Sequence, residues 1–264
     1  SRGLGDVYKR QVLGLYSYDD RAEDLSLENI LNQSINLIAS MPTMMVNAYQ
    51  MKRRYYDKQS MFFHLPKPGQ STAEHILSTY RPDQKFTHEE AKLLDMCLLV
   101  HADHGGGNCS TFTTRVLSSS GTDTYSAISA AIGALKGPKH GGANIKVVRM
   151  FEDMKENLSD WSDEEEISRY LRALLHKEAF DHAGLIYGMG HAVYSLSDPR
   201  ARIFRSFVEK LSAEKGYEKE FALYDAVSRL APKIIADERQ IYKGVSPNVD
   251  FYSGFAYSLS LIHI

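Results

Sequence analysis

Hydrophobic residues recur at three- and four-residue spacing from Asp19 onward, and almost nowhere do they alternate with polar residues over the length of a strand. This spacing is typical of amphipathic α-helices. One broad apolar stripe over residues 25–41 predicts a helix that stops before Pro42. Its members are Leu25, Leu27, Ile30, Leu31, Ile35, Leu37 and Ile38. The pattern predicts an all-α protein with functional residues in its Gly-rich connections.

Capping residues indicate where several of these helices begin. The segments Thr87-His88-Glu89-Glu90 and Ser162-Asp163-Glu164-Glu165 both resemble capping boxes. Asp198 followed by Pro199 places a cap and a first-turn proline ahead of another helix. Residues 221–239 form a further amphipathic pattern with interspersed Lys and Arg. These signals predict at least four helices downstream of residue 87.

One predicted helix is built of small residues. Thr122 or Asp123 can cap it, and Gly137-Pro138 ends it after Leu135. The small residues are Ser126, Ala127, Ser129, Ala130, Ala131, Gly133 and Ala134. Because such side chains let another backbone approach closely, we expect this helix in a helix–helix interface, either within the subunit or between subunits.

Composition excludes several classes of protein. The 264 residues contain 31 Lys and Arg against 33 Asp and Glu, and this balance argues against nucleic acid as a partner. No apolar run is long enough for a membrane span or for a signal peptide, so we predict no membrane association and a cytoplasmic location. Cys97 and Cys109 lack a CxxC pattern and are predicted to be buried free thiols.

The two ends do not match the body of the chain. Residues 1–11 and 258–264 resemble translated sequencing-adapter read-through, and we predict that both segments are non-native. On that interpretation the chain is a fragment truncated at both ends. We accordingly expect the 264-residue chain as written to be inactive or poorly folded.

Four short segments interrupt the helical pattern and concentrate His, Asp, Arg and Gly. They read HADHGGGN (101–108), GPKHGGAN (137–144), GMGHAVYSLSDPR (188–200) and PNVD (247–250). Glycine permits close backbone approach to a ligand, so such loops are typical of binding sites. His101 and His104 alone could be a metal pair, but no HExxH pattern or carboxylate set completes it, and we predict no metal.

Single residues in these segments also have structural explanations. His140 could make an ordinary loop hydrogen bond, and Asp198 could be only a helix cap. Arg200 lies in the first turn of a helix, where a cation opposes the helix dipole. Its position hints at a ligand carboxylate nearby.

Taken together and in this order, the four segments resemble those of the citrate synthase family, and the resemblance extends over most of residues 16–257. It implies a mainly helical, two-domain subunit in a homodimer, with a small domain inserted in a large one. The implied boundaries are 12–143 for part of the large domain, 144–252 for the small domain, and 253–257 for the re-entry into the large domain.

The resemblance also implies an acyltransferase activity, the condensation of acetyl-CoA with oxaloacetate and hydrolysis of the thioester to citrate and CoA. Asp250 matches the base that removes a proton from the thioester methyl group. His140 matches the donor to the developing enol oxygen, and His191 the residue that polarises the ketone of oxaloacetate. No prosthetic group is implied, since acetyl-CoA is a co-substrate.

Substrate contacts are implied in the same way. His104, Asn108 and Arg200 match family ligands of oxaloacetate. The family holds the adenine of CoA with main-chain groups of one loop, and Lys243 matches a lysine near the CoA phosphates. The loop residues are Ile186, Tyr187, Gly188, Met189 and Gly190. Ser195 departs from the pattern, because other members often carry Lys or Arg there.

Three other functions remain open on the sequence. A 2-methylcitrate synthase would share every motif and prefer propionyl-CoA. A non-catalytic relative would serve as a binding or interaction module, although His140, His191 and Asp250 are intact. A metal-dependent hydrolase built on His101 and His104 would contain zinc.

Overall fold

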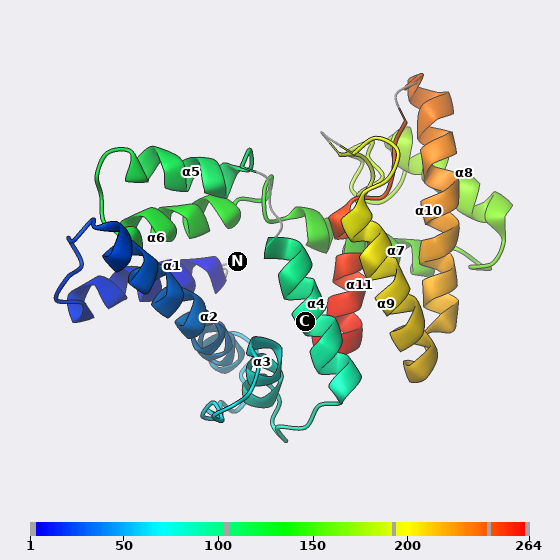
Figure 1. The fold of residues 1–264 in the computed structure, drawn as a ribbon. Helices are drawn as coiled ribbons and strands as arrows, with labels where there is room; N and C mark the ends of the chain where they lie inside the picture. Colours follow the sequence, from blue (N-terminus) through cyan, green and yellow to red (C-terminus); the bar gives the residue numbers. More distant parts are fainter. Residues whose placement is uncertain (1–3, 103–105, 192–193, 242–243, 262–264) are drawn as a thin grey trace. The chain divides into compact units, whose positions relative to one another are not determined.

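The computed structural model describes residues 4–102, 106–191, 194–241 and 244–261. Within them the chain forms eleven α-helices, one short 3-10 helix and no β-strand, which confirms the predicted all-α class (Figure 1). None of the described helices is long and apolar enough to cross a membrane. The chain divides into two compact units, Ser1–Gly142 and Ala143–Ile264.

The first unit contains seven of these elements. They are α1 (Leu4–Leu15), η1 (Tyr16–Tyr18), α2 (Leu27–Tyr55), α3 (Thr72–Tyr80), α4 (His88–Ala102), α5 (Cys109–Ser118) and α6 (Thr124–Leu135). The small-residue helix α6 packs against both α5 and α1, as its composition predicts. The Ser129 hydroxyl donates to the carbonyl of Lys9 at 3.0 Å. Residues 4–11, which we predicted to be non-native, are thus helical and in contact with α6.

The predicted end of α2 at Pro42 is wrong. The helix continues to Tyr55 with Pro42 buried inside it. Proline lacks the N–H that would bond the carbonyl of Ile38. The helix nevertheless continues through this position, so the one hydrogen bond lost at Pro42 does not break it.

The apolar stripe of α2 lies largely on the exposed face of that helix. The exposed fractions are 84% for Leu27, 58% for Leu31 and 54% for Ile35. Polar Asn29 and Gln33 are buried instead. The Asn29 amide donates to the carbonyls of Arg21 and Asp24 at 2.9 and 2.8 Å, and that of Gln33 to Asp19 Oδ2 at 2.8 Å. These bonds satisfy the amides and select the face that is turned inward.

Most of the predicted helix starts are confirmed. Thr87 and Glu90 form the reciprocal bonds of a capping box at the start of α4, at 3.2 and 2.9 Å. Asp123 caps α6 through the N–H of Ser126. The box predicted at Ser162 is displaced by one residue. Asp163 is the cap instead, because the Ser162 hydroxyl donates to Asp160 at 2.7 Å.

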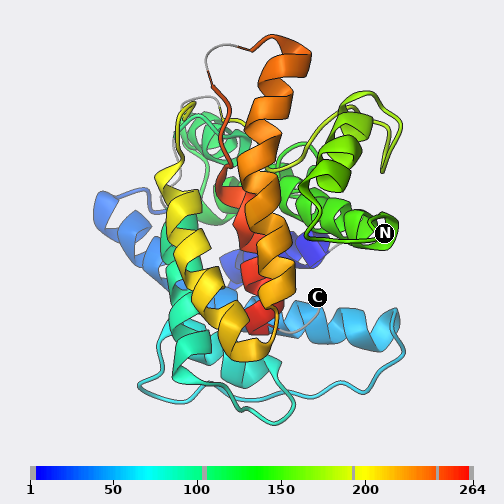
Figure 2. The ribbon, with the colours of Figure 1, turned by 90° about the vertical axis from the view of Figure 1, so that its right-hand side faces the viewer.

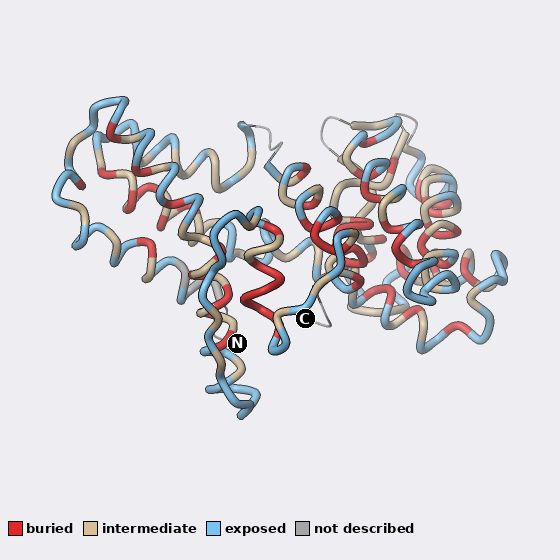
Figure 3. Tube along the Cα trace, turned by 60° about the horizontal axis from the view of Figure 1, so that its bottom comes forward, coloured by how far each residue is buried: buried red, intermediate tan, exposed pale blue. Residues whose placement is uncertain are grey.

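The second unit consists of α7 (Ala143–Asn157), α8 (Glu164–Leu175), α9 (Pro199–Lys215), α10 (Glu218–Arg239) and α11 (Val249–Leu261). Two views show α9 beside α10 and α11 (Figures 1 and 2). Tyr224 stacks between Phe151 and Phe255, with ring centroids 3.5 and 4.8 Å away. In Figure 3 buried positions recur along these helices between exposed ones, as expected for amphipathic helices around one core.

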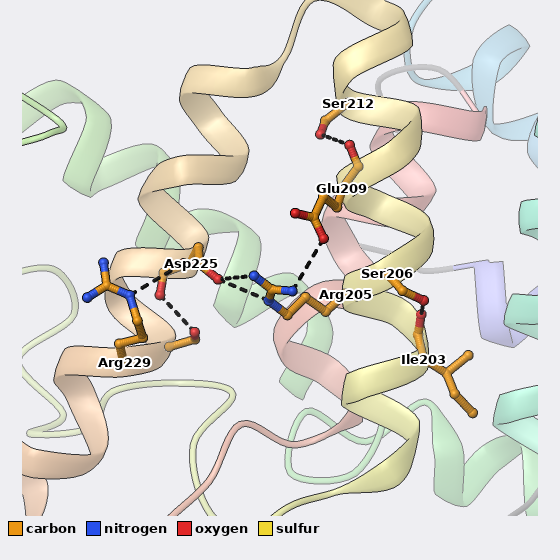
Figure 4. A network of polar contacts seen from close by, with 8 residues as sticks. Ile203, Arg205, Ser206, Glu209, Ser212, Asp225 and Arg229 are labelled. Carbon is orange, nitrogen blue, oxygen red and sulfur yellow. Dashed lines mark hydrogen bonds and ion pairs between the residues drawn. The ribbon is translucent and has the colours of Figure 1, made fainter.

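A network of charged side chains joins three helices of this unit. Arg205 on α9 donates from Nε and from a terminal nitrogen to Asp225 Oδ1 on α10, at 3.0 and 2.7 Å (Figure 4). Arg229 lies on the other side of Asp225, 3.4 Å from Oδ2, and also donates to Glu164 of α8 at 2.8 Å. Asp225 therefore connects α9 to α10 through Oδ1, and through Oδ2 it holds Arg229 of its own helix.

The two cysteines differ from each other. Cys97 is buried, and burial raises the pKa of its thiol to about 12. Cys109 is exposed, so the prediction that both thiols are buried is wrong. Cys109 begins α5 directly after its cap, Asn108.

Candidate functional site

The predicted site residues divide between the two units. Asn108 and His140 belong to the first, and His191, Arg200 and Asp250 to the second. His104 and Lys243 lie outside the described residues. The two groups are described separately below.

His140 contacts a serine that sequence reasoning missed. Its Nε2 lies 3.1 Å from the Ser110 hydroxyl oxygen, 30 residues earlier in the chain. That hydroxyl donates to Oδ1 of Asn108 at 2.7 Å, so its only proton is used there. Ser110 therefore accepts from the Nε2–H of His140. The serine therefore orients the ring of this histidine.

Asn108 acts as a helix cap in the structure. Its Oδ1 accepts from the N–H of Thr111 at 2.9 Å, and its amide nitrogen donates to the Thr111 hydroxyl at 2.8 Å. An Asn cap stabilises a helix start by satisfying an N–H that has no partner within the helix. The same residue thus starts α5 and orients Ser110 toward His140.

Arg200 is held by the residue that caps its own helix. Asp198 Oδ1 accepts from the Arg200 N–H and from its Nε, both at 3.0 Å, and Oδ2 accepts from a terminal nitrogen at 2.9 Å. Burial acts to raise the pKa of Asp198, but the hydrogen bonds and the charge of Arg200 outweigh it and lower that pKa. The partner of the unusually placed cation is therefore Asp198.

His191 faces two N–H groups. Its Nδ1 accepts from the N–H of Tyr194 at 3.2 Å, and its Nε2 lies 3.2 Å from a terminal nitrogen of Arg200. Arg200 can only donate, and its N–H points at Nε2. The Tyr194 N–H and the Arg200 guanidinium therefore lie at the two nitrogens of the ring and fix its position.

Tyr194 is a second residue that sequence reasoning missed. Its ring lies 4.9 Å from that of His191, and the guanidinium of Arg200 lies 5.6 Å from its centroid. A cation over an aromatic face is attracted to it. The side chain and the main chain of Tyr194 therefore orient both functional residues. The sequence pattern offered no signal for this contact.

The segment from Gly188 to Gly190 is joined to the segment that precedes Asp250. Gly190 donates its N–H to the carbonyl of Ser246 at 2.9 Å, and the N–H of Asn248 donates to the carbonyl of Gly188 at 2.8 Å. The Asn248 amide adds a bond to the carbonyl of Gly190 at 2.9 Å. These bonds align two of the predicted functional loops within one unit.

Gly188 is required by its conformation and its surroundings. Its φ is +81°, and a Cβ there would lie 3.0 Å from Cα of Phe251 and 3.0 Å from Val147. A larger residue would be strained and would also push the loop away from α7 and α11. The loop thus approaches the start of α11 as closely as its backbone allows.

Asp250 lies in the first turn of α11, two residues after Asn248. The Asn248 side chain accepts from the Asp250 N–H at 3.0 Å. A carboxylate in a first turn is favoured by the helix dipole. Asn248 therefore fixes the main chain at Asp250 and, through its amide, the loop ending at Gly190.

Comparison with known proteins gives the family. The sequence model described as "Citrate synthase, C-terminal domain" matches residues 5–263. The chain belongs to the citrate synthase family. It is 36% identical to the citrate synthase of Acidithiobacillus ferridurans over 258 residues, 96% of this chain and 58% of that protein. It is 41% identical to that of Deinococcus radiodurans over 172 residues, 65% of this chain and 41% of that protein.

Solved citrate synthases share the fold. The enzyme from Pyrobaculum aerophilum superposes with a TM-score of 0.79 at 25% identity, covering 99% of this chain and 62% of that one. A ternary complex of the Thermoplasma acidophilum enzyme with carboxymethyl coenzyme A and oxaloacetate gives 0.78 at 26% identity, covering 98% and 62%. The chain therefore spans about three-fifths of the length of these structures.

Proposed function

We propose that this protein is a citrate synthase that condenses acetyl-CoA with oxaloacetate and hydrolyses the product thioester to citrate and CoA. The observation that carries the proposal is that the His191 imidazole and the Arg200 guanidinium lie side by side, with Nε2 and a terminal nitrogen 3.2 Å apart. Oxaloacetate offers a ketone oxygen beside a carboxylate, and these groups suit a histidine donor and an arginine. The resemblance of the motifs around both residues supports the same assignment.

Asp250 is proposed as the base for the first step. Its carboxylate takes a proton from the methyl group of acetyl-CoA, and the electron pair of that C–H bond forms an enol with the thioester carbonyl. The enol carbon then attacks the ketone carbon of oxaloacetate, while His191 donates to the ketone oxygen. Water finally cleaves the thioester, releasing CoA as the thiol and citrate as the acid.

His140 is proposed to stabilise the enol oxygen by donating from Nδ1. In the structure Nε2 carries the ring proton, because Ser110 donates to Asn108. Donation from Nδ1 requires the hydroxyl of Ser110 to turn and donate to Nε2 instead. Ser110 can make either bond, so it would stay in contact with Nε2 in both tautomers of His140.

The other contacts in the proposal follow the family resemblance. Asn108, His104 and Arg200 would bind oxaloacetate, and Lys243 would lie near the CoA phosphates. The main chain of Ile186, Tyr187, Gly188, Met189 and Gly190 would hold the adenine. No prosthetic group takes part, and a cytoplasmic location stays a prediction.

A homodimer is part of the proposal. Ser126, Ala130 and Gly133 share one side of α6 and remain half-exposed. Small residues at this spacing let a second helix approach closely. Ala130→Arg should therefore weaken the dimer, observed as a lower mass in light scattering.

The test is thiol release from acetyl-CoA and oxaloacetate by the protein expressed from its complete gene. Asp250→Asn and His140→Ala should each lower kcat by about a hundredfold or more. No thiol release by folded wild-type protein would overturn the proposal. Faster turnover with propionyl-CoA than with acetyl-CoA would identify a 2-methylcitrate synthase instead. Selectivity for one methylene is modest, about 10–200-fold.

A further inference from the structure

Three side chains fasten the start of the proposed CoA loop to α7. Lys146, in the first turns of α7, lies 2.6 Å from Oδ2 of Asp181 through its Nζ. The hydroxyl of Tyr187 donates to the same oxygen at 2.7 Å. Oδ1 of Asp181 accepts from the N–H of Ala183 at 3.2 Å. One carboxylate thus joins a helix to the first residues of the loop.

Aromatic contacts reinforce this group. The Lys146 ammonium lies 5.6 Å from the ring centroid of Phe180 and 5.5 Å from that of Tyr187. The two rings meet edge to face with centroids 6.0 Å apart. An ammonium is attracted to aromatic faces, so both rings hold Lys146 beside Asp181. The arrangement fixes the direction in which the chain enters Gly188.

The charges of the group are mutually compensated. Burial acts to raise the pKa of Asp181, but hydrogen bonds from Lys146 and Tyr187 outweigh it and lower that pKa. Burial, together with the bond to Asp181, raises the pKa of Tyr187 to about 12. At neutral pH the Asp181 carboxylate therefore pairs with the Lys146 ammonium and accepts a hydrogen bond from the neutral phenol of Tyr187.

The two ends of the loop are held by different means. At Gly188 and Gly190 the hydrogen bonds to residues 246–248 involve main-chain atoms of the loop. At Tyr187 the bond is made by side chains. A substitution at Asp181 or Lys146 therefore loosens one end of the loop and leaves its main-chain atoms unchanged. Neither residue belongs to the proposed substrate ligands.

We propose that Lys146, Asp181 and Tyr187 form a clamp that positions the main chain of Ile186 to Gly190 for the CoA moiety of acyl-CoA. The clamp residues are positioning residues, and the inference rests on the proposed function of that loop. A main-chain site for adenine depends on the direction of its N–H and C=O groups. Release of the Tyr187 end should weaken the binding of acyl-CoA more than it slows the chemical step.

The test compares Asp181→Asn and Lys146→Gln with a matched control at another ion pair made by α7. Lys155 pairs with Glu220 of α10 at 2.6 Å with similar burial, so Glu220→Gln removes a comparable ion pair away from the loop. Asp181→Asn and Lys146→Gln should raise the KM for acetyl-CoA about tenfold, while kcat and the KM for oxaloacetate stay within about twofold. Glu220→Gln should leave all three kinetic values unchanged. Asp181→Glu should recover part of the affinity.

The results separate the clamp from the proposed function. Equal losses of Tm in all three variants with an unchanged KM for acetyl-CoA would overturn the clamp and leave the function intact. If the wild-type enzyme does not turn over, the affinity for CoA alone, measured by isothermal titration calorimetry, tests the clamp instead. Weaker binding of CoA by Asp181→Asn than by Glu220→Gln would support the clamp, and no binding by the wild type would overturn it.

Discussion

Asp198 accepts three hydrogen bonds from Arg200 while only 1% of its surface is exposed. One bond comes from the main chain and caps α9, and two come from the guanidinium and fix its plane. Breaking a buried charge pair by removing one partner is costly because the other charge is left uncompensated. The same carboxylate therefore caps the start of α9 and orients the cation that is proposed to bind substrate.

Asp198→Asn should weaken oxaloacetate binding with little loss of fold. Asparagine is as good a helix cap as aspartate, so the bond to the Arg200 N–H can persist. The charge that orients the guanidinium is lost, and the dissociation constant for oxaloacetate should rise about tenfold or more. Isothermal titration calorimetry measures the constant directly.

Asp163→Asn is the matched control for that change. Asp163 caps α8 through the N–H groups of Glu165 and Glu166, on a helix that carries none of the proposed substrate ligands. Its substitution should leave oxaloacetate affinity unchanged. A similar loss in both variants would show that Asp198 acts only as a cap.

Ser110→Ala should slow the chemical step. Without the hydroxyl, Nε2 of His140 loses the partner that orients the ring, and kcat should fall by about 10–100-fold. Thr113→Ala on the same helix removes a hydroxyl that bonds only the carbonyl of Cys109 within the helix, so it should be silent. Single-turnover kinetics would measure the rate of the chemical step in both variants. A change in the KM for oxaloacetate alone would contradict this role for Ser110.

Local signals in the sequence predicted much of the fold. The caps at Thr87, Asp123 and Asp198 depend on residues within three positions of each other, so their chemistry can be read from the chain itself. The predicted end of α2 at Pro42 and its predicted buried face were wrong, because tertiary contacts decide where this helix ends and which face is buried. Gln33 is buried through a bond from Thr124, which is 91 residues away. Spacing within one helix does not contain that information.

The same limit applies to the candidate site. The motifs predicted His140, His191 and Arg200 as candidates because each lies in an unusual Gly-rich segment, and Asp250 because it lies in the segment PNVD. Supporting residues such as Ser110, which contacts His140, and Asp181, which contacts Lys146, stand in ordinary surroundings and act across 30 or more residues. Their hydroxyl and carboxylate groups become informative only when the fold brings them to a ring or an ammonium.

Asp225→Ala should lower the stability of the second unit. Asp225 bridges Arg205 and Arg229, and its side chain is 26% exposed while that of Arg205 is 41% exposed. Partial exposure screens the charges, so the free energy of unfolding should fall by about 1 kcal/mol. Urea unfolding followed by circular dichroism measures it. Glu209→Ala removes an exposed pair with Arg205 one turn along the same helix and should cost about 0.5 kcal/mol or less.

Acid should destabilise the protein through carboxylates that are hydrogen-bonded in the fold. The backbone N–H groups of Ser159 and Asp160 lower the pKa of Glu166 from 4.5, and hydrogen bonds likewise lower the pKa of Asp160 from 3.8. Because the folded pKa lies below the unfolded one, the stabilisation is present above the unfolded pKa and is lost as pH falls through the folded pKa. The free energy of unfolding should stay level from neutral pH to about pH 5 and then decline.

Urea titrations at pH 7, 5 and 3.5 would measure this, and Glu166→Gln should show a shallower decline than the wild type. Stability that rises below pH 4.5 would contradict the assignment, because it would mean that the folded state binds protons more tightly than the unfolded chain.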